Sequence, residues 1–387
     1  MSFEFLTPVS DLVVEYAESL PKGTLGHSIC VHTKDSGIPE LSKIKVVVVG
    51  VRENRNDPNR SEDSVSFDAI RKALYGLYPG NWDVVIADIG DVIPGDSIND
   101  TYYLVQEILS ELLKKDCIPV VIGGGQDLVY AQYRAFDALE QMVNLVNVDS
   151  KFDLGDTSAP ITNASFVGKI IVEQPYNLFN YSNIGYQTYF NSQEEIDLIE
   201  KLYFDAYRLG EVISDITVVE PITRDADIVV VDLGVIDQPS LKGMHMSPNG
   251  FNGREICAIS RYAGISDKVK SFGIYEFRNF AGEEISSLLI AQMVWYFVEG
   301  VNYRSGELVI RDSNHVMHYN VPVDDEILSF YKSGKTGRWW IEIPFIASGH
   351  NKLKRHTLLP CTYDDYERAC NQEIPERWYK AKQKNEV

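Results

Sequence analysis

The sequence predicts a three-layer α/β fold, in which helices cover both faces of a mostly parallel sheet. Over the first three quarters of the chain, short β-branched runs alternate with longer segments of helical periodicity, which is typical of such a sheet. The 387 residues and 44% apolar content suffice to bury a large core. No apolar run approaches the ~20 residues of a membrane helix, so we expect no membrane span.

Seven segments are predicted as strands and six as helices. The second helix is expected to open at Asn99 or Asp100, which are good N-cap residues, and its apolar positions Leu104, Ile108 and Leu112 recur at helical spacing. The predicted strands are residues 45–51, 82–89, 118–122, 143–149, 179–187, 228–232 and 270–275. The predicted helices are residues 64–76, 100–115, 126–141, 193–204, 252–263 and 283–300.

The alternation of strands and helices stops after residue 300. We therefore expect a core domain, residues 1–300, and a C-terminal extension, residues 301–387. From residue 331 onward the chain holds 11 Lys and Arg against 7 Asp and Glu, whereas the whole chain has a net charge of -20. The basic segment 350–356 and the pair Trp339 and Trp340 suit a contact surface for a protein partner. Packing of the extension on the acidic core explains the same features.

The acidic composition argues against a nucleic-acid partner, and the cysteine pattern argues against two kinds of structural site. A net charge of -20 repels a phosphate backbone, so a nucleic-acid partner is not expected. The five cysteines are odd in number and form no C-x-x-C pair, which argues against a disulfide framework and a zinc ribbon. The N-terminal segment has acidic residues where a signal peptide carries basic ones, so a cytoplasmic location is expected.

The residues that leave three predicted strands are the candidates for a functional site, because ligands of open α/β sheets bind outside the carboxyl ends of the strands. The three segments read GGGQD from Gly123, NVDSKFD from Asn147 and VDLGVID from Val231. Alone, the glycine run fits a tight turn, and it matches neither a P-loop nor a Rossmann fingerprint. Asp149 and Asp153 follow a buried strand, so these carboxylates need a cation, a metal or hydrogen-bond donors nearby.

Together and in this order, the three segments resemble the motifs G-G-[GD]-H-[DS], D-A-H-x-D and D-x-D-x-x-D-P of the arginase/agmatinase/formimidoylglutamase family. The resemblance includes the glycine-rich segment 246–255 and the strand that ends at Glu276, and it covers about residues 40–300. It implies a doubly wound, mostly parallel sheet of about eight strands and a homo-oligomer. It also implies two Mn²⁺ ions, which activate a bridging hydroxide to cleave a guanidino or formimino C–N bond.

Three of the six metal-ligand positions that the resemblance implies are changed in this chain. Gln126 stands in place of a histidine and offers a weak, neutral amide oxygen, and Gly234 offers no side chain. Lys151 also replaces a ligand, and a protonated ammonium has no lone pair for a metal. We therefore expect no metal cofactor. The carboxylates are kept at Asp149, Asp153 and Asp232.

Lys151 suggests what replaces the charge of the metals. Two unit charges ~4 Å apart at an effective dielectric constant of ~20 interact by ~4 kcal/mol. An ammonium among Asp149, Asp153 and Asp232 would therefore stabilise these carboxylates and repel an incoming dication. The sequence predicts that Lys151 closes the former metal site in this way.

The resemblance also implies a remnant of the substrate site. Glu276 stands in place of the family's glutamate that faces the guanidinium or formimino group, although pairing with Arg254 or Arg278 explains a strand-end carboxylate as well. Asn163 lies in the loop after the second motif, where the family places a polar residue or a histidine. The chain has no histidine in residues 152–244, so a proton shuttle from that loop is not expected.

Three functional hypotheses follow from these residues. The first, which the changed ligands favour, is a pseudoenzyme that keeps the fold for binding or scaffolding. The second is a hydrolase of linear amidines, similar to formimidoylglutamase or arginase, that holds a single ion with the remaining carboxylates and Gln126. The third is a metal-free enzyme that uses Lys151 as nucleophile or base.

Overall fold

A sheet of ten strands forms the centre of the protein in the computed structural model, which describes residues 2–57, 65–241, 247–277, 284–307, 315–344 and 358–386. Its strands are β1 (Leu6–Thr7), β2 (Cys30–Val31), β3 (Val46–Val51), β4 (Ile86–Val92), β5 (Ile118–Gly123), β6 (Val143–Val148), β7 (Leu178–Tyr186), β8 (Asp205–Arg208), β9 (Ile228–Asp232) and β10 (Ser271–Tyr275).

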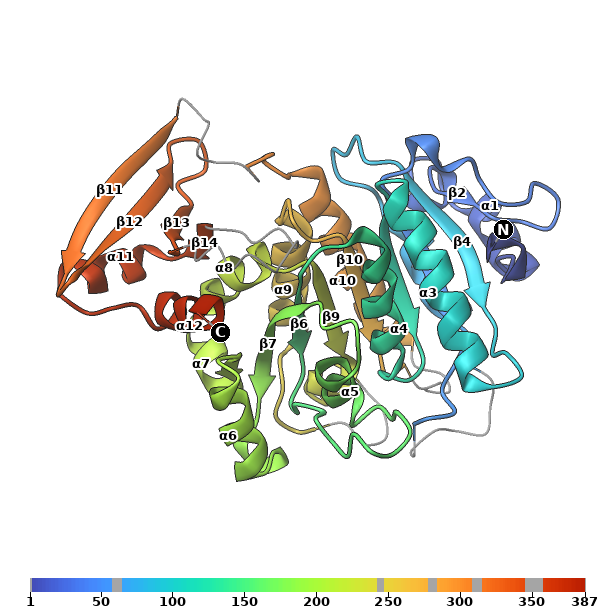
Figure 1. The fold of residues 1–387 in the computed structure, drawn as a ribbon. Helices are drawn as coiled ribbons and strands as arrows, with labels where there is room; N and C mark the ends of the chain where they lie inside the picture. The colour runs from blue at the N-terminus through green and yellow to red at the C-terminus, as the bar shows by residue number, and fades with distance from the viewer. Residues whose placement is uncertain are drawn as a thin grey trace.

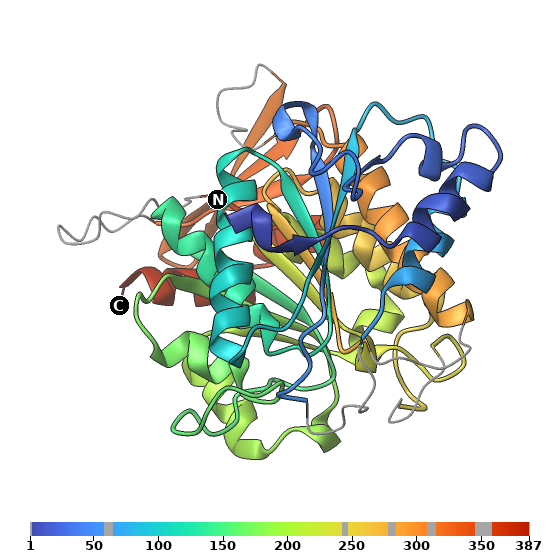
Figure 2. The same cartoon turned by 90° about the vertical axis from the view of Figure 1, so that its right-hand side faces the viewer.

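The order of the strands is β1-β4-β3-β5-β10-β9-β6-β7-β8, with β2 beside β4 (Figure 1). The eight strands from β3 to β10 pair in parallel, and β1 pairs antiparallel with β4. The sheet twists between two layers of helices (Figure 2). The predicted three-layer α/β fold with a mostly parallel, doubly wound sheet of about eight strands is confirmed.

Helices pack on both faces of this sheet because its strands send apolar side chains alternately into two cores. In β3, Val46 and Val48 face one core, and Val47 and Val49 face the other. The first core is covered by α1 (Asp11–Ser19), α2 (Asp68–Gly76), α7 (Leu209–Ser214), α8 (Val219–Arg224), α9 (Gly253–Ile265) and α10 (Glu284–Asn302). The second is covered by α3 (Ile98–Lys114), α4 (Leu128–Arg134), α5 (Phe166–Val172) and α6 (Gln193–Lys201). No helix in the described part of the chain combines the length and apolar character needed to cross a membrane.

Three differences from the predicted elements have local causes. The N-cap of α3 is Ser97, not Asn99 or Asp100, because Asp100 closes a capping box with Ser97 from the third helical position. The predicted helix 126–141 is divided, because a 3₁₀ helix (Ala135–Leu139) follows α4. The prediction lacks β1, β2 and β8, because two to four residues show too little alternation.

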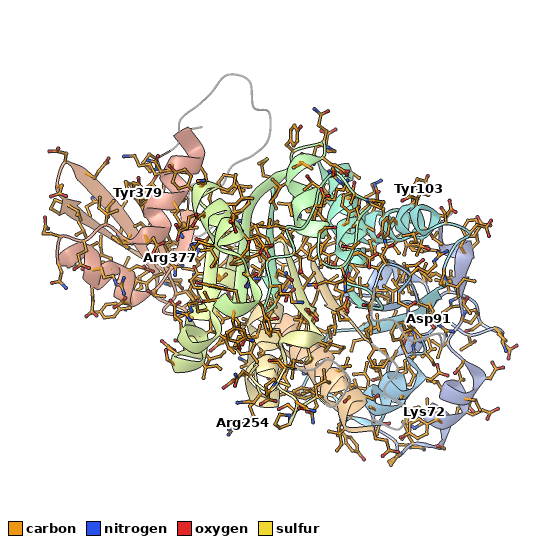
Figure 3. All side chains as sticks on the ribbon, turned by 90° about the horizontal axis from the view of Figure 1, so that it is seen from below. Lys72, Asp91, Tyr103, Arg254, Arg377 and Tyr379 are labelled. Carbon is orange, nitrogen blue, oxygen red and sulfur yellow. The ribbon has the colours of Figure 1, made fainter. Side chains whose placement is uncertain are left out.

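The C-terminal extension folds into an antiparallel sheet and two helices, with a small core of its own. Figure 3 places Arg377 and Tyr379 of this extension at the opposite end of the molecule from Tyr103. Its core includes Val321, Leu328, Phe330, Trp339 and Trp378. The elements are β11 (Val316–Val323), β12 (Glu326–Ser333), β13 (Trp339–Glu342), β14 (Leu358–Cys361), α11 (Tyr363–Cys370) and α12 (Glu376–Glu386).

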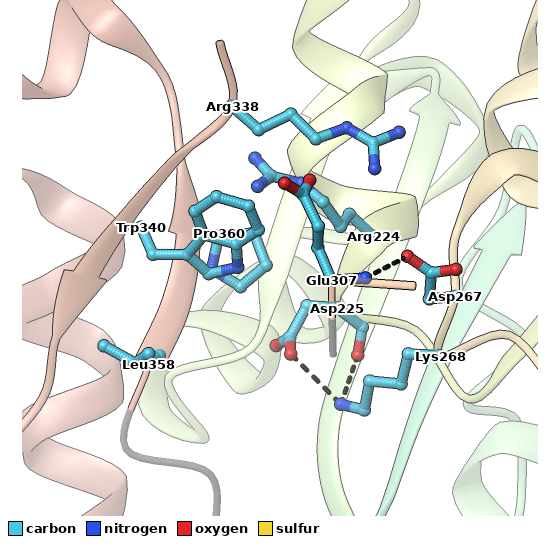
Figure 4. Close-up of a pocket in the computed structure, with 9 residues that line it drawn as sticks. All are labelled: Arg224, Asp225, Asp267, Lys268, Glu307, Arg338, Trp340, Leu358 and Pro360. Atoms are coloured by element: carbon cyan, nitrogen blue, oxygen red, sulfur yellow. Dashed lines mark hydrogen bonds and ion pairs between the residues drawn. The ribbon is translucent and has the colours of Figure 1, made fainter. Parts of the chain in front are cut away.

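Arg224, the last residue of α8, joins the extension to the core domain. Its guanidinium donates to the backbone oxygen of Trp339 at 3.1 Å and to that of Cys361 at 3.2 Å. Its Cζ atom lies 4.4 Å from the ring centroid of Trp340, in the pocket of Figure 4. Burial lowers the pKa of Arg224 to about 10. Trp339 and Trp340 are each only 6% exposed, so both rings pack within the chain.

Trp340→Ala is expected to lower the free energy of unfolding by about 3 to 5 kcal/mol, because it leaves a cavity beside Arg224 and removes the ring that the guanidinium covers. Urea unfolding followed by circular dichroism measures the change. The matched control is Tyr379→Ala, whose ring is 48% exposed and whose loss should change stability by about 0.5 kcal/mol or less. An equal loss of unfolding free energy in the two variants would contradict a stabilising contact between Trp340 and Arg224.

Asp127 carries a buried carboxylate that ties α4 to α3. The Tyr102 hydroxyl donates to its Oδ2 at 2.5 Å, and the side-chain amide of Asn56 donates to that hydroxyl at 2.8 Å. Its Oδ1 has no hydrogen-bond partner in the described structure. Burial raises the pKa of Asp127 to about 6, so the folded state holds this proton more tightly than the unfolded chain does.

The contribution of Asp127 to stability should therefore fall as the pH rises from about 4 to about 6. In this window the folded state binds the proton and the unfolded chain releases it, and a difference of about two pKa units corresponds to ~3 kcal/mol. Asp127→Asn keeps an acceptor for Tyr102 and removes the titration. Urea unfolding of both proteins across this range should show the wild type losing stability relative to the variant. A stability difference between the two proteins that does not change with pH would show that Asp127 does not titrate in this range.

Candidate functional site

The three motif segments converge at the carboxyl ends of four central strands. β5, β10, β9 and β6 are neighbours in the sheet, and they lead to Gln126, Glu276, Asp232 and Asp149. The turn after β5 requires glycine, because a Cβ atom on Gly124 would lie 2.2 Å from a backbone oxygen of the neighbouring loop. Residues that are far apart in the sequence thus share one end of the sheet.

Asp149 is fully buried and accepts three hydrogen bonds. Its Oδ2 accepts from Gln126 Nε2 at 3.0 Å and from Asn147 Nδ2 at 3.2 Å, and its Oδ1 accepts from the backbone N–H of Lys151 at 2.9 Å. Gln126 Nε2 also donates to Asn147 Oδ1 at 3.0 Å. Gln126 therefore presents its N–H group to this carboxylate, and Asn147 is a site residue that the sequence motifs do not identify.

Asp153 belongs to the same loop and interacts directly with Asp149. Its side chain is buried, and its Oδ2 has no hydrogen-bond partner in the described structure. Burial and the negative charge of Asp149 raise the pKa of Asp153 well above its usual range, and Asp232 adds to the effect. The two carboxyl groups are therefore expected to share a proton. The φ of Asp153 is 53°, a left-handed conformation that costs a residue with a side chain about 1 kcal/mol or more.

Lys151 does not lie among the carboxylates, contrary to the prediction that its ammonium closes the metal site. Its backbone N–H donates to Asp149 Oδ1. Its side chain is exposed, and its Nζ atom lies 5.9 Å from the ring centroid of Phe190. It makes no ion pair with another described residue. The exposed position also lacks the burial that a metal-free lysine nucleophile requires.

The side chains at this site do not fit a pair of Mn²⁺ ions. Gly234 contributes only a backbone N–H, which donates to Asp232 Oδ1 at 2.6 Å, and a Cβ atom there would lie 3.1 Å from that oxygen. Lys151 is directed outward, and Gln126 donates where a metal ligand must accept. Over the described ranges, no group of three or more His, Cys, Asp or Glu side chains is arranged to hold a metal ion.

Glu276 and Asn163, the two candidate substrate-binding residues, lie in contact. Asn163 Nδ2 donates to Glu276 Oε1 at 3.3 Å, and the same oxygen accepts from the Gln126 backbone N–H at 2.9 Å. Gln126 thus contacts Glu276 through its backbone and Asp149 through its side chain. Glu276 is 4% exposed and has a φ of 64°, so a second strained residue stands at the same end of the sheet.

Asp57 is a second site residue that the sequence motifs do not identify. It is 3% exposed, and its Oδ1 accepts from Asn163 Nδ2 at 3.5 Å. It lies in the loop after β3, outside every motif, so no local pattern distinguishes it from other loop carboxylates. Arg254, one expected partner of Glu276, does not pair with it among the described residues, and Arg278 lies outside them.

The sequence of the chain matches the model of the Arginase family over residues 44–299. A formimidoylglutamase from Macrococcus caseolyticus is 29% identical over 185 residues, which are 46% of this chain and 58% of the relative, less than two thirds of its length. A formimidoylglutamase from Staphylococcus aureus is 23% identical over 244 residues, which are 60% of this chain and 78% of the relative.

Solved structures of a formiminoglutamase and a formimidoylglutamase share the fold of this chain. A Trypanosoma cruzi formiminoglutamase with Mn²⁺ superposes with a TM-score of 0.61 at 16% identity, covering 68% of this chain and 96% of that one. A formimidoylglutamase from Bacillus subtilis gives a TM-score of 0.60 at 17% identity, covering 76% of this chain and 100% of that one. The family match extends over most of the core domain and includes all three motif segments, and the chain therefore belongs to the arginase family.

Proposed function

We propose that this chain is a pseudoenzyme of the arginase family, which keeps the strand-end site for binding and does not hydrolyse amidines by two-metal chemistry. The contact that carries this proposal is the hydrogen bond from Gln126 Nε2 to Asp149 Oδ2 at 3.0 Å. At a position where the family resemblance implies a metal ligand, this side chain satisfies the carboxylate with an N–H group instead. A donor in this place supports a carboxylate that functions without a metal ion.

The remaining ligand positions support the same proposal. A bridging hydroxide needs two ions about 3.5 to 4 Å apart, each with its own ligands. Gly234 has no side chain to give, and the side chain of Lys151 is exposed. The proton that Asp149 and Asp153 are expected to share offsets part of the negative charge that two ions would otherwise neutralise.

The alternative is a formimidoylglutamase-like hydrolase with altered metal use. It is favoured by the contact of Asn163 with Glu276 at 3.3 Å and by the three kept carboxylates. The names of the relatives point in the same direction. A single hard cation with oxygen ligands would require the Gln126 side chain to turn its oxygen toward the site.

Metal analysis separates the two functions. Protein purified without chelator and then equilibrated with Mn²⁺ is expected to carry close to zero manganese by plasma mass spectrometry. Lys151 and Gly234 provide no acceptor at their two ligand positions, and Gln126 presents its N–H group. It is also expected to release no formamide from formiminoglutamate. One or two ions per chain, with formamide release that a chelator abolishes, would overturn the pseudoenzyme proposal in favour of the hydrolase.

Restoring the three changed ligand positions tests whether these side chains are what prevents manganese binding. The triple variant Gln126→His, Lys151→His and Gly234→Asp is expected to bind two Mn²⁺ ions per chain, measured by calorimetry. The matched control carries Gln126→His and Gly234→Asp with Lys151 unchanged, and it should bind no more than one ion. A folded triple variant that binds no manganese would show that features other than these side chains prevent binding.

A further inference from the structure

The strand β11 forms one edge of the antiparallel sheet in the C-terminal extension. It pairs with β12, and no other described strand pairs with it. Figure 1 shows β11 at the left-hand edge of the molecule. Its eight residues read VMHYNVPV from Val316 and include no lysine, arginine, aspartate or glutamate. A long edge strand without charges is a template for pairing with another strand, and most proteins protect such an edge with charged side chains.

Alternate residues of β11 face this outer edge. The backbone N–H of Gly334 donates to His315 O at 2.8 Å, so His315 and every second residue after it bond on the β12 side. At Pro322 the outer edge is closed, because proline has no N–H group and its oxygen accepts from Gln372 Nε2 at 3.0 Å. The positions that face outward and remain open are Val316, His318 and Asn320.

The three open positions are symmetric about the middle one, His318. Among the described residues, no backbone group pairs with them on the outer side. A second β11 in antiparallel orientation can place its own His318 opposite this one. Val316 of each copy then lies opposite Asn320 of the other, so that all three N–H groups of each strand reach a carbonyl oxygen. One copy of the strand thus offers the complete set of partners that another copy needs.

The charges at the two ends of the β11–β12 hairpin favour the same orientation. Asp324 and Asp325 form the exposed turn between the strands, whereas Lys332 and Lys335 lie at the opposite end, near the start of β11. An antiparallel approach brings the acidic end of each copy toward the basic end of the other, and a parallel approach would bring like ends together. The repulsion from the net charge of -20 is screened beyond about 10 Å at 0.1 M salt.

From these observations we infer that β11 is a self-association surface, on which a second copy of this chain adds its own β11 in antiparallel orientation about a two-fold axis at His318. The antiparallel sheets of the two copies then join into one continuous sheet. This surface belongs to the extension and lies outside residues 44–299, which match the family model. It is therefore independent of the function proposed for the strand-end site.

Sedimentation equilibrium of the full chain tests the inference at protein concentrations from ~1 to ~100 µM, where complexes of modest affinity dissociate. The expected result is a reversible equilibrium between monomer and dimer. A chain that stays monomeric over this range would overturn the inference.

His318→Lys is expected to raise the dissociation constant of the dimer roughly tenfold or more, because the two-fold axis places two ammonium groups directly opposite each other. The matched control is Ile327→Lys, which adds the same charge at a 70% exposed position of β12, away from the open edge, and should leave the constant unchanged. A thermal melt verifies that each variant is folded. Equal dissociation constants for these two variants would show that the copies meet at another surface.

A second pair of variants tests the backbone hydrogen bonds themselves. Asn320→Pro removes an outward N–H group and no bond to β12, and β11 already contains a proline at the next outward position, Pro322. It should weaken the dimer, whereas Asn320→Ala should not. Both variants lose the hydrogen bond from Ser329 Oγ to Asn320 Oδ1, so the comparison isolates the N–H group. A dimer that is equally stable in folded Asn320→Pro and Asn320→Ala would overturn pairing through β11.

Discussion

The contact between two buried carboxyl groups, Asp149 and Asp153, is the constraint on which the rest of the site depends. Two neighbouring negative charges cannot both persist in a buried place without a counter-charge or a shared proton. In the family to which this chain belongs, the resemblance assigns that task to metal ions. Here the task falls to amide donors and to a shared proton. The amides of Gln126 and Asn147 are therefore part of the electrostatic balance of the site as well as of its shape.

The sequence could predict the convergence of the site, because parallel strands place their carboxyl ends at one edge and the motifs follow those strands. The same rule placed Glu276 at this edge, whereas its contact with Asn163 was not predicted. The direction of Lys151 could not be predicted in this way. It depends on a backbone bond to Asp149, which fixes the turn and leaves the side chain on the exposed side. Asp57 escaped prediction because its contact joins distant segments and leaves no pattern in its own loop.

In the C-terminal extension, too, local features could be predicted from the sequence and contacts between distant segments could not. Its aromatic residues and its charge were evident in the sequence, but their arrangement in an antiparallel sheet depends on pairing between strands and on one arginine from the core domain. Trp340 illustrates the point. An exposed tryptophan would suit an interface, whereas this ring covers a buried guanidinium, and only the three-dimensional contact distinguishes the two.

Arg224 has a further consequence through its position in the chain. It ends α8, and the strand that begins four residues later, β9, ends at Asp232 beside the carboxylate pair. The extension is thus anchored to the segment immediately upstream of a site residue, and the five residues of β9 lead from the anchor to the site. The path from this anchor to the site runs along a strand that β10 and β6 hold on both sides.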